Sequence, residues 1–324
     1  MAEKKMSTLA LLQILSEFSD SQHPLSLKEL QQRLENNFDC KLDRRTLYNN
    51  LQRLQEMGYN INMYKENGSG YYLEDRLFEE AEVMLLCNAI HASNYIPKRD
   101  SRDLIDKLLK TQSRYAASRF RNSVYVDNLR KTENRDFFYN LQILLEAIEE
   151  GVCVEFDYMR FNRQKQLVPR RKEKYVLHPY YLVYANDKTY LIARNEKYEG
   201  FSHYRLDKIR QIHKTNRKVI PLQKSEDPYQ YANHKIYMFG GEEEYFLLRC
   251  DDRILDDILD SFGKEVPVVD FDDHHFVTRI QSSRQGMFYF ALQYLEYLEI
   301  LEPADARQHL TRILQQALLR YQKK

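Results

Sequence analysis

The 324-residue sequence has no tryptophan, few cysteines and no long apolar run. The longest apolar stretch, near Val83–Cys87, is far shorter than the roughly 18 residues that a membrane-spanning helix needs. The two lysines near the N-terminus are followed by no apolar core, so we expect no secretion signal. The four cysteines are scattered and offer no close pair to a metal, which predicts free thiols in a reducing compartment. We therefore expect a cytoplasmic protein that crosses no membrane.

Signatures of catalysis are also missing. The sequence has no glycine-rich phosphate loop followed by Lys and Ser or Thr, no His-Glu-x-x-His and no Gly-x-Ser-x-Gly. The run Asp272-Asp273-His274-His275 has metal-ligand residue types, but it lies between two strand-like segments and is typical of a polar hairpin turn. We therefore expect no enzyme activity, no metal site and no cofactor.

Charge of neither sign dominates, because 49 basic residues face 48 acidic ones. The two signs are nevertheless unevenly distributed: residues 1–80 have 10 basic and 13 acidic groups, 81–135 have 11 and 6, 136–220 have 16 and 11, and 221–324 have 12 and 18. A basic middle between mildly acidic ends favours modules with different partners. Ordinary solvated charge gives the same totals, so that alternative stays open.

The first 135 residues have mostly helical periodicity. Residues 1–75 contain three helix-length segments, at 7–20, after a capping residue at Ser26, and from Asp43 to Gly58. Two short strand-like segments, at 60–64 and 71–73, then flank Asn67-Gly68-Ser69-Gly70, a strong hairpin signal. This order predicts a winged helix-turn-helix domain at 1–75. Further helical segments in 76–135 are too small for a large core of their own and are predicted to link or dimerise.

The period changes to that of strands after a helix at 136–150. Strand-length segments at 152–159, 174–185, 188–195 and 201–209 predict a small twisted sheet or barrel within 136–220. Pro221 and the stretch at 225–228 mark the next boundary. Residues 221–324 alternate strand and helix and are predicted to form a small α+β domain. The expected fold class is therefore α+β, with several domains.

The third predicted helix separates apolar from polar residues. At 100° per residue, Leu47, Leu51 and Leu54 lie on one side and must face the first two helices. Arginine can bind guanine or phosphate from the opposite side, and Asn or Gln can bind the adenine edge. The candidate DNA-binding residues are Arg44, Arg45, Thr46, Tyr48, Asn49, Gln52 and Arg53 on this helix, and Lys65 on the predicted wing. A solvated helix face gives the same pattern, and the net negative charge of residues 1–80 argues against DNA binding.

Three groups of residues resemble a known family of bacterial regulators. Residues 45–51, Arg-Thr-Leu-Tyr-Asn-Asn-Leu, resemble the recognition-helix signature Arg-Thr-aliphatic-x-Arg-Asp-Leu of DeoR-like regulators. Residues 177–182, 189–191 and 204–209 resemble the WYL domain, which is named for a Trp-Tyr-Leu triplet. Residues 298–303 and the following helix resemble the C-terminal extension, WCX, of the same proteins. The departures from the family are Asn49-Asn50 for Arg-Asp, Thr189 for Trp, Lys208 for the second Arg, and Ser202 for an Arg that many members have.

The resemblance implies an Sm-like or SH3-like barrel at 136–220 that binds nucleotides or single-stranded nucleic acid. Strand alternation independently places Tyr190 on the same face as Arg194, and His203 on the same face as Arg205. Aromatic faces next to guanidinium groups suit bases and phosphates. The candidate effector-binding residues are Tyr158, Arg170, Arg171, His178, Tyr190, Arg194, His203 and Arg205. Alternatively, these are outward residues of a solvated sheet face, and His178 is a packed core histidine.

Together these patterns predict a ligand-responsive transcriptional regulator whose partners are a double-stranded DNA operator and an anionic effector. A homodimer is expected, joined through residues 76–150 or the C-terminal domain, because a helix-turn-helix monomer binds only a half-site. The alternative is a nucleic-acid-binding or protein-interaction accessory protein in which the middle domain is the main functional surface.

Overall fold

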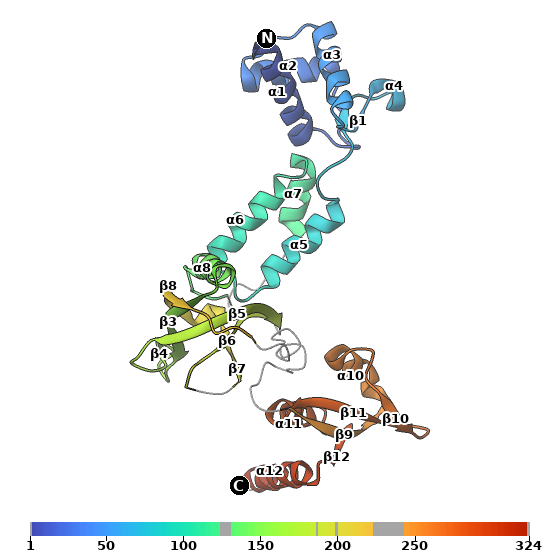
Figure 1. Cartoon of the computed structure of the whole chain (residues 1–324). Helices are drawn as coiled ribbons and strands as arrows, with labels where there is room; N and C mark the ends of the chain where they lie inside the picture. The colour runs from blue at the N-terminus through green and yellow to red at the C-terminus, as the bar shows by residue number, and fades with distance from the viewer. Residues whose placement is uncertain (1, 124–130, 186, 198–199, 223–242, 323–324) are drawn as a thin grey trace. The chain divides into compact units, whose positions relative to one another are not determined.

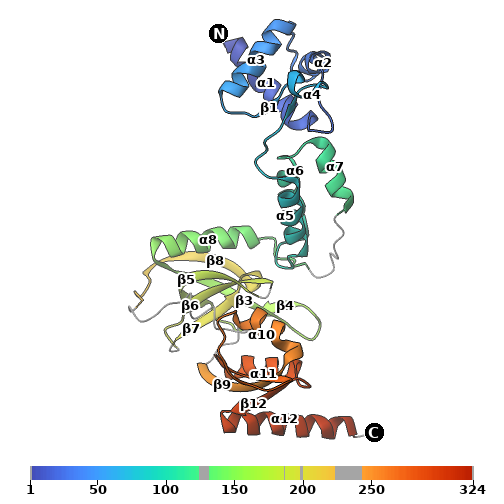
Figure 2. The same cartoon turned by 90° about the vertical axis from the view of Figure 1, so that its right-hand side faces the viewer.

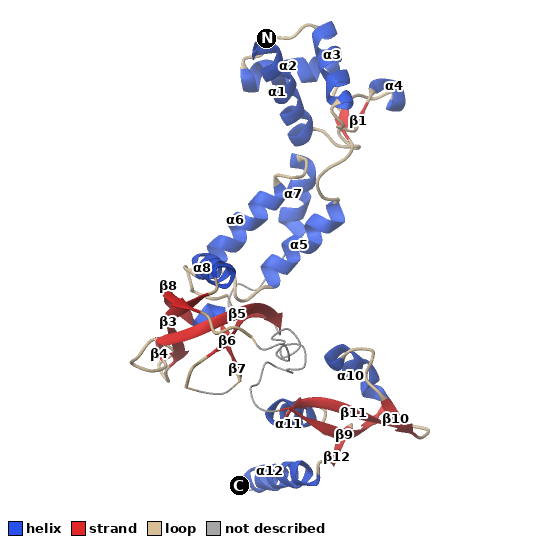
Figure 3. Cartoon of the chain, in the orientation of Figure 1, coloured by secondary structure: helices blue, strands red, loops and turns tan. Residues whose placement is uncertain are grey.

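The computed structural model describes residues 2–123, 131–185, 187–197, 200–222 and 243–322. The chain divides into two compact units, 1–133 and 134–324. Helices dominate the first unit and strands are concentrated in the second, as Figure 3 shows, which confirms the α+β class. The divisions at 75, 135 and 220 stay predictions. Among the described residues, no helix combines the length and apolar character needed to cross a membrane.

The first unit begins with three helices: α1 (Ala2–Phe18), α2 (Leu27–Phe38) and α3 (Arg44–Glu56). The predicted start of α2 is confirmed, because the Ser26 hydroxyl accepts from the Glu29 N–H while the Glu29 carboxylate accepts from the Ser26 N–H. Asp43 caps α3 by accepting a hydrogen bond from the Thr46 N–H at 2.9 Å. The three helices share a leucine-rich core that includes Leu11, Leu15, Leu30, Leu34, Leu47, Leu51 and Leu54.

The predicted wing contains a helical turn. Strands β1 (Ile61–Asn62) and β2 (Tyr72–Leu73) pair antiparallel, and the short helix α4 (Tyr64–Asn67) lies between them. The predicted strand at 60–64 was therefore wrong beyond Asn62. The cause is local: the Asn67 side chain donates to the Gly70 carbonyl and accepts from the Ser69 and Gly70 N–H groups, which competes with strand pairing.

Three further helices complete the first unit: α5 (Glu80–Ala92), α6 (Lys98–Leu109) and α7 (Arg114–Ser123). Their small core contains Val83, Cys87, Ile105, Leu109, Ala116 and Phe120. Polar contacts join these helices to α1 and the loop after it. Asp20 accepts from the Ser113 hydroxyl at 2.5 Å, and the rings of His23 and Tyr115 stack with centroids 3.8 Å apart. Residues 1–133 thus form one packed unit.

The second unit begins with helix α8 (Phe137–Glu150), which ends at Gly151 in the left-handed conformation. A curled six-stranded sheet follows, in the order β4-β3-β5-β6-β7 with β8 paired to β3 (Figure 1). The strands are β3 (Val152–Phe161), β4 (Leu167–Pro169), β5 (Tyr175–Ala185), β6 (Lys188–Arg194), β7 (Phe201–Arg205) and β8 (Ile209–Lys218). The predicted strand at 201–209 is confirmed as β7 up to Arg205 and was wrong beyond it, because the 3-10 turn η2 (Leu206–Lys208) interrupts it. Asn134, Asn140 and Arg210 donate to main-chain carbonyls at or beside this turn and hold it.

The C-terminal part of the second unit has alternating strands and helices (Figure 2). They are β9 (Glu243–Asp251), η4 (Asp252–Ile254), α10 (Leu255–Phe262), β10 (Val268–Phe271), β11 (His275–Ser283), α11 (Arg284–Gln293), β12 (Leu298–Glu302) and α12 (Ala304–Gln322). The sheet order is β10-β11-β9-β12, and alternate residues of β9 (Phe246, Leu248, Cys250) face a core shared with the three helices.

The run Asp272–His275 is a turn between β10 and β11, as predicted from its polar composition. The Asp272 carboxylate accepts from the N–H groups of His274 and His275. Over the residues whose positions are described, no group of His, Cys, Asp or Glu is arranged to hold a metal ion. Asn186 and the boundary residues 225–228 lie outside the described residues.

Candidate nucleic-acid interface and effector site

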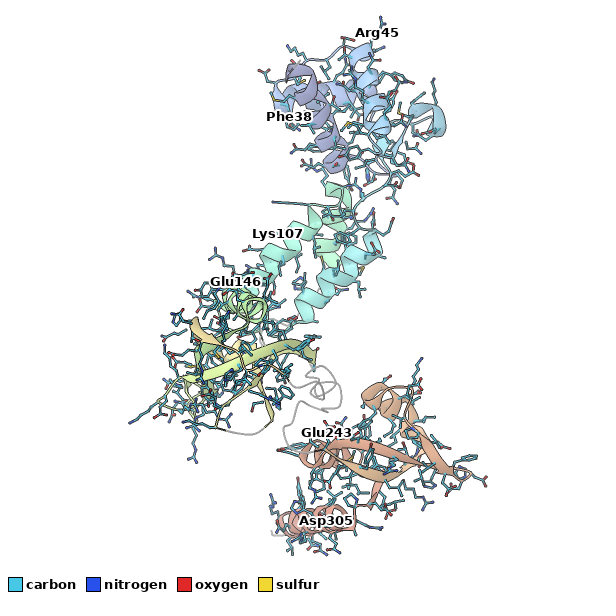
Figure 4. All side chains as sticks on the ribbon, viewed as in Figure 1. Phe38, Arg45, Lys107, Glu146, Glu243 and Asp305 are labelled. Atoms are coloured by element: carbon cyan, nitrogen blue, oxygen red, sulfur yellow. The ribbon has the colours of Figure 1, made fainter. Side chains whose placement is uncertain are left out.

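Helix α3 presents a polar face that its neighbours leave open. Leu47, Leu51 and Leu54 are buried against α1 and α2. The opposite side carries five exposed residues, Arg45, Asn49, Gln52, Arg53 and the acidic Glu56, and the exposed Arg44 lies on its flank. Figure 4 shows Arg45 on the outer side of the helix. Within the described part of the chain, no hydrogen bond or ion pair engages the side chains of Arg45, Asn49, Gln52 or Arg53.

Thr46 and Tyr48, also candidates for DNA contact, are half-buried. The Thr46 hydroxyl donates to the Asp43 carboxylate at 2.7 Å, so its first role is in capping the helix. The hydrogen bonds from Thr46 lower the pKa of Asp43, which keeps the cap ionised. Tyr48 packs against the leucine core. Both side chains thereby support the exposed face and fix its orientation.

Asn50 was noted from the sequence only as a departure from the family pattern, although it holds α3 to α1. Its side chain is buried, and its amide donates to the Ser7 hydroxyl at 3.1 Å. The signal was available, because Asn50 lies beside Leu47, Leu51 and Leu54 on the inward side of the predicted helix. A buried amide with a partner fixes the angle at which two helices meet.

The wing is held in place by main-chain bonds. Leu25 and Tyr71 exchange both N–H to carbonyl hydrogen bonds, at 2.8 and 2.9 Å. Gly70 precedes this bridge, and a Cβ atom there would lie 2.7 Å from the Leu25 carbonyl oxygen. Lys65 is exposed on α4, one residue after Tyr64. The wing therefore presents Lys65 from a fixed backbone.

Four of the predicted effector residues share one face of the curled sheet. The register pairs Tyr190 with Arg205, Ile192 with His203, and Arg194 with Phe201. Because partners in an antiparallel pair lie on the same side, Tyr190, Arg194, His203 and Arg205 are brought together. The Tyr190 and His203 rings meet edge to face at 6.0 Å, and the Arg194 guanidinium lies 4.7 Å from the Phe201 ring centroid.

Arg205 is held by a carboxylate on the same turn. Its Nε and Nη2 donate to the two Asp207 oxygens at 3.0 and 2.8 Å. Burial works to lower the pKa of Arg205, but the hydrogen bonds and charge of Asp207 raise it above its ordinary value. Tyr190 is 7% exposed, and burial raises its pKa. The site thus combines a permanent cation with an un-ionised phenol.

Tyr158 and Arg171 lie apart from these four side chains. Tyr158 belongs to an aromatic cluster with Phe156, Tyr175 and Tyr204, and Tyr204 alternates with Arg205 along β7. The Arg171 guanidinium lies over the Tyr175 ring at 3.6 Å. Tyr158 still touches the proposed site, because its hydroxyl accepts from the Arg205 N–H at 3.0 Å. Burial raises the pKa of Tyr158, so this hydroxyl stays protonated.

His178 lies in the core, 1% exposed, as the alternative of a packed histidine describes. Its Nδ1 accepts from the Ile220 N–H at 3.2 Å and lies 3.2 Å from the Cys153 sulfur. Burial, and then the nearby Arg217 and Arg194, lower its pKa. Arg170, in contrast, is exposed after β4, where its charge acts on the Tyr158 hydroxyl. The register pairs His178 with Arg194, so His178 lies beside one of the four side chains but is packed in the core.

Comparison with known proteins gives one family match within the sequence and likenesses in structure to 16 solved chains, among them the following two distant ones. Proteasome accessory factor B/C (PafBC) of Arthrobacter aurescens is 16% identical with a TM-score of 0.28; the alignment covers 98% of this chain but only 49% of PafBC, so this chain spans about half of its length. A CRISPR Cas-related protein is 14% identical with a TM-score of 0.39, over 97% of this chain and 92% of that one. These scores are too low to carry an argument, and no curated protein matches the chain. Residues 139–214, however, match the WYL domain. The curled sheet that holds Tyr190 and Arg205 therefore belongs to a WYL domain.

Proposed function

We propose that this chain is a cytoplasmic, ligand-responsive transcriptional regulator that binds a double-stranded DNA operator through α3. The observation that carries the proposal is the exposed face with Arg45, Asn49, Gln52 and Arg53. No other described residue forms a hydrogen bond or ion pair with these side chains. Buried leucines on the inner side of α3 prevent this face from turning inward. Side chains of these types bind base edges and phosphates in the major groove.

The wing supplies a second contact with the same duplex. Lys65 is exposed on a backbone fixed by the Leu25–Tyr71 bridge, and it is suited to a phosphate beside the groove. A single unit of this kind binds a half-site only. The proposal therefore includes a homodimer, in which residues 76–150 or the C-terminal α+β part set the spacing of two half-sites.

The WYL domain is proposed to bind an anionic effector, a nucleotide or short single strand, at the face around Arg205. Asp207 uses only two of the five N–H donors of the Arg205 guanidinium, so donors remain for a phosphate oxygen. Tyr190 and His203 offer ring edges and faces beside it. An effector that binds there and favours one arrangement of the regulator changes its affinity for the operator. The operator must then change the affinity for the effector by the same factor.

The test is operator binding by gel shift over a series of salt concentrations, with an operator selected from random duplex DNA. We expect Arg45→Ala to weaken operator binding by about 1–3 kcal/mol and to relax its sequence preference. Arg312→Ala is the matched control, because Arg312 is exposed on α12 outside the proposed interface. Unchanged binding in Arg45→Ala, or an equal loss on every sequence, contradicts the proposal.

A further inference from the structure

The tip of the β3–β4 hairpin, residues 158–172, carries basic charge without an acidic residue, whereas the first half of β3 contains Glu155 and Asp157. From residue 158 to residue 172 the sequence contains no Asp or Glu. The six basic residues of this segment are Arg160, Arg163, Lys165, Arg170, Arg171 and Lys172. All except Arg171 are exposed, and within the described ranges none of these five forms an ion pair. Charged protein surfaces usually mix both signs, whereas the charged side chains of this segment are all positive.

Strand pairing and a turn hydrogen bond define the backbone of the hairpin. Arg160 pairs with Val168 and Phe161 with Leu167, and the Asn162 N–H donates to the Gln166 carbonyl at 2.9 Å to close the turn. Within that turn lie Arg163 and Lys165, so both charges are at the tip. Arg160 faces the other side of the strand from Phe161. Positive charge therefore surrounds the tip and one face of the hairpin.

The remaining face carries an exposed aromatic ring. Phe161 is 60% exposed, although burial of a phenylalanine side chain is normally favourable. The ammonium group of Lys208 lies 3.8 Å from its ring centroid. An exposed ring among cations is the combination that proteins use to bind unpaired bases, since the base stacks on the ring while cations contact the phosphates.

We propose that the β3–β4 hairpin and Lys208 form a binding arm for single-stranded nucleic acid. Phe161 stacks on an unpaired base, and Arg160, Arg163 and Lys165 contact the flanking phosphates. The inference rests on the proposed sensing role of the WYL domain and names its effector as a polynucleotide strand, because a free nucleotide at Arg205 makes no use of the hairpin charge. A duplex hides the base faces that Phe161 requires, so the arm selects single strands.

The experiment measures binding of the full chain to a fluorescent single strand of about 12 nucleotides, of DNA or RNA, by anisotropy over a series of salt concentrations. For Arg163→Gln/Lys165→Gln we expect weaker binding and a salt slope shallower by about 1.4, at about 0.7 for each lost phosphate contact. Phe161→Leu should weaken binding about 5- to 150-fold, the range expected for one lost stacking contact.

Each control makes the same kind of substitution at a surface position outside the hairpin. Arg312→Gln/Arg320→Gln removes the same charge from α12, and Phe271→Leu alters another exposed ring; both should bind the strand as the unchanged chain does. Circular dichroism melting of each variant checks that it is folded. A hairpin variant that binds the strand with unchanged affinity and slope overturns the proposal, and so does a duplex that competes with the strand equally well.

Failure of the inference is distinguishable from failure of the proposed function. A chain that binds its operator through Arg45 but no single strand overturns the arm and leaves operator recognition standing. A chain that binds the strand through Phe161 while operator affinity never responds overturns the regulatory coupling and supports the arm.

Discussion

The side-chain amide of Asn134 donates to the main-chain carbonyl oxygen of Asp207 at 3.3 Å, and the Asp207 carboxylate in turn holds the guanidinium of Arg205. Asn134 also donates to the carbonyl of Ile209. This amide therefore fixes the turn that positions the proposed effector site. It does so from the first residue of the second unit.

The residues just before Asn134 are also held by hydrogen bonds, here to the first unit. The Lys131 ammonium donates to the carbonyls of Ile90 and Ser93, and the Thr132 N–H donates to the carbonyl of Asn94, all within the first unit. Only residue 133 separates this anchor from Asn134. The chain therefore leaves the anchored segment of the first unit one residue before the amide that holds the Arg205 turn.

We expect Asn134→Ala to abolish the effect of a single-stranded oligonucleotide on operator affinity while leaving that affinity unchanged without oligonucleotide. The reason is that the substitution removes the bond between the effector turn and the junction. The measurement is the ratio of operator Kd values with and without oligonucleotide. Asn140→Ala is the control, since Asn140 also donates to the Ile209 carbonyl but lies within α8. An unchanged ratio in Asn134→Ala contradicts this role.

Gly70→Ala should destabilise the first unit and weaken operator binding. The new Cβ would lie 2.7 Å from the Leu25 carbonyl oxygen, so the wing must shift, at a cost of about 1–3 kcal/mol. Gly68→Asn is the control, because Gly68 has φ +67° with open space around it and Asn tolerates that backbone. Thermal unfolding and operator Kd are measured for both. Equal operator binding by the two variants would show that the position of Lys65 is unimportant.

Stability should fall as the pH drops below about 6.5, the ordinary pKa of histidine. The folded protein lowers the pKa of His178, so between the folded and unfolded pKa values the unfolded chain binds more protons and acid favours unfolding. Protonation also removes the Nδ1 lone pair that accepts from the Ile220 N–H. Urea unfolding at pH 5 and pH 7.5 measures the effect. His178→Gln should depend less on pH over this range; an identical profile would assign the acid sensitivity to other groups.

The helices were predictable because their signals are local. Leu47, Leu51 and Leu54 repeat at the helical period, and the caps at Ser26 and Asp43 lie within three residues of the groups that they bind. The orientation of α3 follows from those residues alone. The faces of β6 and β7 were likewise accessible through alternation, which places Tyr190 with Arg194 and His203 with Arg205, whereas the register that joins the two strands was not.

The predictions were wrong where the backbone conformation depends on side chains far apart in sequence or on a local network of polar side chains. The break between β7 and β8 depends on Asn134 and Asn140, about 70 residues upstream, which no pattern within 201–209 contains. The helical turn in the wing depends on how the Asn67 side chain binds its neighbours. His178 has the residue type of a binding site, and its burial and its contacts with Cys153 and Ile220 reveal the packed position that the sequence left as an alternative.

Arg76 lies just beyond the predicted end of the winged domain, yet its guanidinium donates to the carbonyls of Ser16 and Ser19 at the end of α1. Burial lowers the pKa of Arg76, although Asp20 and Glu80 oppose that shift. A fragment cut at residue 75 loses these donors together with the Ser113 hydroxyl that binds Asp20. The smallest fragment that melts cooperatively should consequently be 1–133, and protease nicks between β2 and α5 should loosen α3 as well.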